Sequence, residues 1–103
     1  MNDERLIGRV VPVFQRVLGP EKVVTIDRLM GGEDFARYGR AGVPIFMYKI
    51  GALGRNRLDD FGRKGTKPPS LHSPLFYPDP RETLETGVVT MTSALLELLP
   101  VKK

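Results

Sequence analysis

The chain has 103 residues, of which 41% are hydrophobic, enough for one small domain with its own core or for part of a larger domain. It contains no cysteine, which excludes disulfide bonds, a thiolate nucleophile and cysteine-ligated metal within this sequence. No apolar run approaches the ~20 residues of a membrane span, and the polar start predicts no signal peptide. We therefore expect a cytoplasmic protein. Its net charge of +4 is mixed in sign along most of the chain, which favours a solvated surface over an anionic partner.

The first predicted element is a helix that runs to Leu18. Asp3 is a suitable N-cap, and Gly19 followed by Pro20 is typical of a helix end. Pro12 predicts a kink, because its ring removes a backbone donor and crowds the preceding turn. Apolar residues at helical spacing predict one buried face, made of Leu6, Ile7, Val10, Phe14, Val17 and Leu18.

The middle of the chain predicts two strands. Residues 22–26 are rich in β-branched side chains, and residues 43–50 are apolar on both faces, as in a strand buried on both sides. Between them, residues 33–38 predict a short helix. Residues 51–78 predict no regular element, and a stretch of this length is usually functional or disordered.

The last predicted element is a helix with strong start signals. Asp79 is placed as its cap, Pro80 at the first position and Glu82 at the third, as in a capping box. A continuous apolar stripe follows, formed by Leu84, Val88, Met91, Leu95 and Leu98. The order of elements predicts an α/β fold, a small sheet flanked by helices. Because two strands are marginal alone, we expect another segment or oligomerisation to complete the sheet.

His72 is the single histidine and lies near the end of the long loop, just before the capped helix. A neutral imidazole held there could bind a metal or transfer a proton. A zinc site needs about three or four protein ligands, so this chain alone makes a poor metal cage. The alternative is an ordinary packed or surface histidine.

A second candidate is the run Gly31, Gly32, Glu33, Asp34. The glycines permit close backbone approach, and the amides that follow could hold an anion. The paired carboxylates suit acid–base chemistry or support of a metal ligand. The alternative is a turn followed by favourable negative charges at a helix start. The pattern lacks the lysine of a P-loop and the third glycine of a dinucleotide fingerprint.

A basic segment spans residues 55–67. Its five basic residues, Arg55, Arg57, Arg63, Lys64 and Lys67, face only Asp59 and Asp60. This leaves nucleic-acid binding open as a minor hypothesis, although no aromatic residues interleave at the spacing of a base-stacking surface.

Taken together, two motifs resemble one family. The pattern resembles the carboxy-terminal segment of hippurate hydrolases, N-acyl-amino-acid amidohydrolases and aminoacylases. It consists of Met30-Gly31-Gly32-Glu33-Asp34-Phe35, then an apolar segment, then Leu71-His72-Ser73-Pro74-Leu75-Phe76. Residues 18–24 and the closing helix also look similar, so the resemblance covers nearly all of residues 1–103. It implies that the chain is one partial catalytic domain of a three-layer, zinc-peptidase-like fold, without the lid domain and the amino-terminal half.

The resemblance also implies a reaction. Such enzymes hydrolyse the amide bond of N-acyl amino acids or small peptides with one or two divalent metals (Zn, Mn, Co or Ni) and a glutamate as general base. His72 matches the family's last metal ligand. Glu33 and Asp34 match an acidic motif near the active site, to which we assign supporting roles, and Gly31 and Gly32 would shape the substrate pocket.

The family's other ligands, a cysteine, two histidines and a glutamate, lie upstream with the general base and are not in this sequence. We therefore expect the chain alone to hydrolyse nothing and to bind no metal tightly. Its partner would be the missing amino-terminal half, and exposed apolar surface would cause self-association. The rival hypotheses are a stand-alone binding module in which His72 is no ligand and, ranked lower, the nucleic-acid binder.

Overall fold

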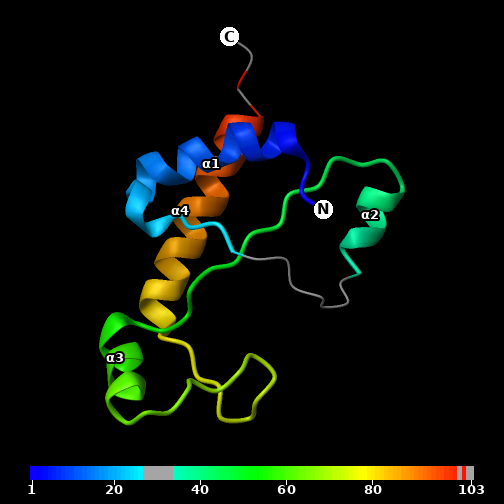
Figure 1. Ribbon diagram of the computed structural model, residues 1–103. Helices are drawn as coiled ribbons and strands as arrows, with labels where there is room; N and C mark the ends of the chain where they lie inside the picture. Colours follow the sequence, from blue (N-terminus) through cyan, green and yellow to red (C-terminus); the bar gives the residue numbers. More distant parts are fainter. Residues whose placement is uncertain (27–33, 100, 102–103) are drawn as a thin grey trace. The chain divides into compact units, whose positions relative to one another are not determined.

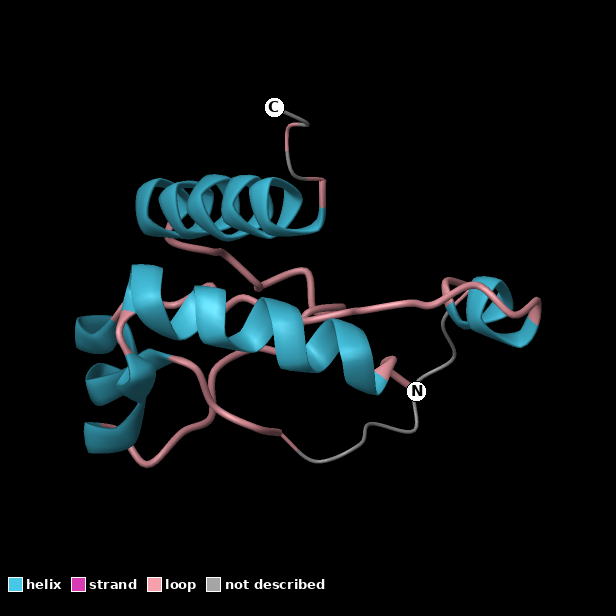
Figure 2. Ribbon diagram, turned by 90° about the horizontal axis from the view of Figure 1, so that it is seen from above, coloured by secondary structure: helices cyan, strands magenta, loops and turns pink. Residues whose placement is uncertain are grey.

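The computed structural model describes residues 1–26, 34–99 and 101, and the regular structure in those residues is entirely helical. Figure 1 labels the α-helices, and Figure 2 shows helices joined by loops, with no strand drawn in the described part. The elements in chain order are α1 (Glu4–Leu18), the short 3-10 helix η1 (Pro20–Lys22), α2 (Ala36–Arg40), α3 (Arg55–Arg63) and α4 (Pro80–Leu98).

The chain divides into two compact units. The first unit comprises Met1–Tyr48 and Val89–Lys103, and the second comprises Lys49–Val88. The first unit holds α1, η1, α2 and the second half of α4. The second unit holds α3, the loop that contains His72 and the first half of α4.

Helix α1 has the predicted bounds, and its two ends explain them. The carboxylate of Asp3 accepts hydrogen bonds from the backbone N–H groups of Arg5 and Leu6, at 3.0 and 3.1 Å, which satisfies donors that have no partner within the helix. Gly19 follows the helix at a φ of 95°, and its N–H donates to the carbonyl of Gln15. A positive φ is easy for glycine and costly for other residues, so Gly19 fixes the end of α1.

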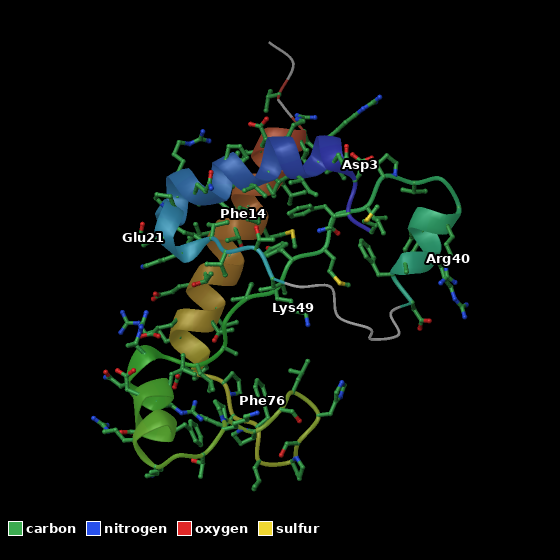
Figure 3. All side chains as sticks on the ribbon, viewed as in Figure 1. Asp3, Phe14, Glu21, Arg40, Lys49 and Phe76 are labelled. Atoms are coloured by element: carbon green, nitrogen blue, oxygen red, sulfur yellow. The ribbon has the colours of Figure 1, made fainter. Side chains whose placement is uncertain are left out.

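The core of the first unit lies between α1 and the second half of α4. Val10 and Phe14 of α1 are buried with Ala94 of α4, and Figure 3 labels Phe14 in this position. The Phe14 ring lies 4.8 Å from that of Tyr48, between centroids, with the planes tilted. Of the predicted α1 face, Val10 and Phe14 are therefore buried, whereas Ile7 is 38% exposed.

The predicted α/β fold is wrong, because no described residue lies in a strand. Lys22 belongs to η1, and residues 23–26 and 43–50 run without regular structure. A β-branched or apolar sequence becomes a strand only when its backbone finds a ladder partner. Here the side chains of Phe46 and Tyr48 pack on the helical core instead. The apolar pattern of residues 43–50 thus reports burial against helices rather than a place in a sheet.

The short helix predicted at residues 33–38 appears as α2, shifted toward the carboxyl end, and the predicted start at Glu33 lies outside the described residues. Gly39 of α2 packs closely on buried Ile45: a Cβ atom at Gly39 would lie 2.8 Å from Ile45 Cδ1. The absence of a side chain at Gly39 therefore lets α2 approach the segment that follows it.

Helix α3 falls inside the stretch for which no element was predicted. It has nine residues and only two large apolar side chains, Leu58 and Phe61, of which Leu58 is 44% exposed. So short and polar a helix gives almost no periodic signal. An ion pair between Asp60 and Arg63, three residues apart, supports its last turn.

Helix α4 starts at Pro80 as predicted and continues to Leu98. Its buried residues are small, Thr90 and Ala94. The stripe that a core-facing helix would bury is exposed over most of its length, at Leu84, Val88, Met91 and Leu95, and Leu98 alone is half-buried. Among the described helices, none is long and apolar enough to cross a membrane.

Candidate functional site around His72

His72 is exposed and lies on a turn in the second unit. Two backbone hydrogen bonds hold this turn: Ser73 N–H donates to the Ser70 carbonyl at 2.9 Å, and Phe76 N–H donates to the Ser73 carbonyl at 3.0 Å. Prolines at 68, 69, 74 and 78 restrict the backbone on both sides. The imidazole is therefore displayed to solvent from a constrained loop.

Ser73, the neighbour of His72, uses its hydroxyl oxygen to accept a hydrogen bond from the backbone N–H of Leu75 at 3.2 Å. A serine that stabilises a turn commonly forms a local hydrogen bond of this kind. Together with Pro74, it makes Ser73 a residue that shapes the loop. The geometry gives no reason to regard it as a nucleophile.

Asp79 fastens this loop to the start of α3. Its carboxylate accepts a hydrogen bond from the backbone N–H of Gly54 and another from Arg57, at 3.2 Å. The Asp79 backbone N–H donates to the Ala52 carbonyl at 2.7 Å. The residue predicted to cap α4 therefore stands at the start of that helix, but the described bonds of its carboxylate go to the start of α3.

Arg57 makes three contacts in the second unit. It pairs with Asp79, donates to the carbonyl of Tyr77 at 2.6 Å, and its guanidinium lies 5.7 Å from the centre of the Tyr77 ring, within reach of a cation–π interaction. These contacts tie α3 to the chain five residues after His72. Arg57 therefore positions the loop that carries the candidate ligand.

The Asp79 carboxylate has a perturbed acidity. The hydrogen bond from the Gly54 backbone, helped by the bond and charge of Arg57, holds the pKa of Asp79 below its ordinary value of 3.8, and partial desolvation opposes this effect. The hydrogen-bond donors, which favour the charged carboxylate, thus lower the pKa of Asp79 by more than desolvation raises it. Asp79 is ionised at neutral pH and serves as an anchor rather than as a proton donor.

A shallow hollow of about 190 Å³ lies along α3 and is lined by Arg57, Asp60, Phe61 and Lys64. These positions lie three and four residues apart, so they occupy one face of the helix. The volume is below the ~300 Å³ at which ligand pockets of drug size begin. The hollow by itself does not make a substrate pocket.

The second predicted cluster lies largely outside the described residues, because Gly31, Gly32 and Glu33 are not described. Asp34 is described and belongs to the first unit. Its exposed carboxylate lies 3.8 Å from the guanidinium of Arg37. The described part of the chain therefore shows one surface ion pair at this cluster and places His72 in the other unit.

No group of three or more histidine, aspartate or glutamate side chains that could hold a metal is found among the described residues. His72 is one possible ligand, and the described residues offer no complete set with it. A metal bound at His72 would therefore need ligands from outside the described residues.

The basic segment is now seen to be α3 and the residues after it. Arg57 and Arg63, two of its five basic side chains, pair with Asp79 and Asp60. Paired guanidinium groups hold the helix in place and offer less charge to a phosphate backbone than the sequence alone indicates. Sequence analysis missed the Asp79–Arg57 anchor because its partners are 22 residues apart, although an aspartate beside Pro80 was a visible signal.

No family model matches the chain, and no solved structure matches it.

Proposed function

We propose that this chain is the carboxy-terminal part of the catalytic domain of a metal-dependent amidohydrolase that cleaves N-acyl amino acids or small peptides. In this proposal His72 is one ligand of the metal, and the remaining ligands and the general base come from an amino-terminal half. The proposal rests on the motif resemblance and on one structural observation. His72 is exposed on a turn that backbone hydrogen bonds hold at both ends.

The geometry gives the neighbours of His72 positioning roles. Ser73 and Pro74 set the turn, and the Asp79–Arg57 pair attaches the end of the loop to α3. A histidine can serve as a metal ligand only if its ring is held within a few tenths of an ångström of the productive position. A metal bound there would polarise the amide carbonyl and lower the pKa of a bound water.

The first test is made on the chain as it stands. Supplied with Zn²⁺, Mn²⁺, Co²⁺ or Ni²⁺, the pure chain should not hydrolyse N-acetyl or N-benzoyl amino acids, because the other ligands and the base are missing. Metal-dependent cleavage by the pure chain would show that the assignment of the missing groups is wrong.

The second test reads the genomic DNA upstream of Met1 in frame. The proposal expects a Cys-x-His pair, an adjacent Glu-Glu and a later histidine. In the assembled enzyme, His72→Ala should then remove bound metal, measured by elemental analysis, together with hydrolysis. Ser70→Ala, at an exposed neighbour, is the matched control. Full metal content and full activity in the His72→Ala enzyme would refute the ligand role.

A stand-alone binding module is the second candidate, and the exposed apolar side chains of α4 favour it. In that case no ligand set is encoded upstream, and His72→Ala leaves binding unchanged. The upstream sequence therefore separates the two functions without an activity assay.

A further inference from the structure

The peptide bond between Asp79 and Pro80 has the groups that cleavage by the chain itself requires. Of the 9 prolines in the sequence, Pro80 is the one that follows an aspartate. The Asp79 carboxylate is close in covalent structure to its own backbone carbonyl, so attack on that carbon closes a five-membered cyclic anhydride. The Pro80 nitrogen carries no hydrogen and leaves as a secondary amine once it is protonated.

The backbone carbonyl of Asp79, which is the target of this attack, accepts two hydrogen bonds from Thr83. The Thr83 N–H donates to it at 3.1 Å and the Thr83 hydroxyl at 2.6 Å. The same hydroxyl lies 3.5 Å from the Ala52 carbonyl, so the bond to Asp79 is the shorter one. The N–H bond is common to helix starts, whereas the hydroxyl bond is an addition made by this threonine. Two donors on one carbonyl oxygen stabilise the negative charge that develops there during acyl transfer.

The Asp79 carboxylate is ionised and both of its oxygens are held. Oδ2 accepts from the Gly54 N–H, and Oδ1 accepts from Arg57 at 3.2 Å. The charged groups that face it are Arg57 on α3 and, beside Gly54, the carboxylate of Glu82 on α4. The donors keep the Asp79 carboxylate unprotonated in mild acid, but they also engage the lone pairs that attack requires. The side chain is 29% exposed, so water reaches it.

We propose that the folded chain cleaves its own Asp79–Pro80 bond in mild acid. An oxygen of the Asp79 carboxylate forms a bond to the Asp79 carbonyl carbon, and the bond from that carbon to the Pro80 nitrogen breaks. The electron pair stays on the nitrogen, which takes a proton from the acidic solvent. Water then opens the anhydride. Asp79 is left with two carboxyl groups and Pro80 with a free secondary amine, and the net reaction consumes one water.

Two neighbours act on this reaction in opposite directions. Thr83 accelerates it, because its two donors stabilise the charge on the carbonyl oxygen. Arg57 restrains it, because the carboxylate must leave the guanidinium to attack. All of these groups belong to the second unit, and neither His72 nor a metal takes part. Self-cleavage can therefore fail or succeed independently of the proposed amidohydrolase function.

The test follows the full chain at about pH 5, where an aspartate carboxylate is ionised and solvent can protonate the leaving amine. Mass spectrometry of the incubated protein should show two fragments, residues 1–79 and 80–103, while circular dichroism verifies that the helices persist. Asp79→Glu should give neither fragment, because its carboxylate would have to close a larger ring. A wild type that stays intact, or an Asp79→Glu variant cut at the wild-type rate, would overturn the proposal.

Thr83 distinguishes this reaction from the acid lability of an Asp-Pro bond in an unfolded chain. Folded Thr83→Val should be cleaved about tenfold more slowly, an effect smaller than in a buried oxyanion hole because this site is partly exposed. Thr83→Ser keeps the hydroxyl and should retain the wild-type rate. Thr92→Val, the same replacement at an exposed position of α4, is the matched control. Equal rates for folded wild type and Thr83→Val would show that the fold does not promote the cleavage.

Arg57→Gln tests the restraint. While folded, this variant should be cleaved about two- to fivefold faster than wild type, a modest gain because the ion pair is partly exposed. In denaturing urea, wild type, Thr83→Val and Arg57→Gln should all be cleaved at one rate, since the contacts that distinguish them are gone. Slower cleavage of folded Arg57→Gln would contradict the restraining role.

Discussion

Asn2 pairs with Met47 through both groups of its side-chain amide. Asn2 Nδ2 donates to the Met47 carbonyl at 2.7 Å, and Asn2 Oδ1 accepts from the Met47 N–H at 2.8 Å. This exchange of two bonds is what a residue on a neighbouring strand would provide. The Asp3 N–H extends it by donating to the Ile45 carbonyl at 2.8 Å. The start of the chain thus satisfies backbone groups of Ile45 and Met47 without any strand among the described residues.

Asn2→Ala should therefore destabilise the first unit. It removes two hydrogen bonds, each worth about 1 kcal/mol at most in a partly exposed place, so we expect a loss of about 1 kcal/mol in the free energy of unfolding. The measurement is urea unfolding followed by circular dichroism. Gln15→Ala, at an exposed position on α1, is the control and should change stability little. Equal midpoints for both variants would mean that the Asn2–Met47 pair contributes nothing.

The hydroxyl groups of Tyr48 and Thr90 form a hydrogen bond of 2.9 Å inside the first unit. Tyr48→Phe and Thr90→Val should each cost about 1 kcal/mol, because each removes this partly buried hydrogen bond. The double variant should cost less than the sum, since both polar groups are then gone. The four unfolding curves of this cycle give the coupling energy. Strict additivity would show that the bond does not stabilise the unit.

Both ends of α1 and the start of α4 were predictable from the sequence, and the packing of residues 43–50 without a sheet was not. Asp3, Gly19 and Pro80 act through groups a few residues away, so their signals are complete within the sequence. Residues 43–50 look the same whether they pack in a sheet or against helices, because periodicity reports burial and not the partner. The missing distinction lay in Asn2, which is 45 residues from Met47 in sequence.

Gly39 and Ile45 provide a test of packing between α2 and the segment after it. Gly39→Ala gains helix propensity, yet its Cβ would lie 2.8 Å from Ile45 Cδ1, so we expect a net loss of about 1 kcal/mol. Ile45→Val removes that methyl group and should restore part of the loss in the double variant. Gly8→Ala in α1 meets no atom within 4 Å and should stabilise by roughly 0.5–1 kcal/mol. A stabilising Gly39→Ala would contradict the close approach.

The candidate site was predicted only as far as local sequence reaches. The turn at His72 follows from Ser73, Pro74 and their neighbours, and the ligand role of His72 stays a prediction. The Asp79–Arg57 anchor could not be predicted, because α3 itself has too few apolar residues to be recognised. An aspartate before a proline predicts a cap of the helix that follows, whereas the described bonds of the Asp79 carboxylate go to the start of α3.

Asp79 should make stability fall in acid. Its pKa is lowered in the folded state from 3.8, so the folded state favours the ionised form. The resulting stabilisation is fully present above pH 3.8 and is lost as the pH falls through that value to the lower, folded-state pKa. Asp79→Asn should therefore be less stable than wild type at neutral pH, and the difference should shrink toward roughly pH 2 as Asp79 becomes protonated.

The measurement is urea unfolding of both proteins from neutral pH down to roughly pH 2. Asp59→Asn, at an exposed carboxylate of α3, is the control and should keep the acid-dependent loss of wild type. Arg57→Gln should weaken the acid dependence without removing it, because the Gly54 N–H is the largest cause of the lowered pKa and remains in place. If Asp79→Asn loses stability in acid as steeply as wild type, the carboxylate does not anchor α3, and the His72 loop must be held by its own turn alone.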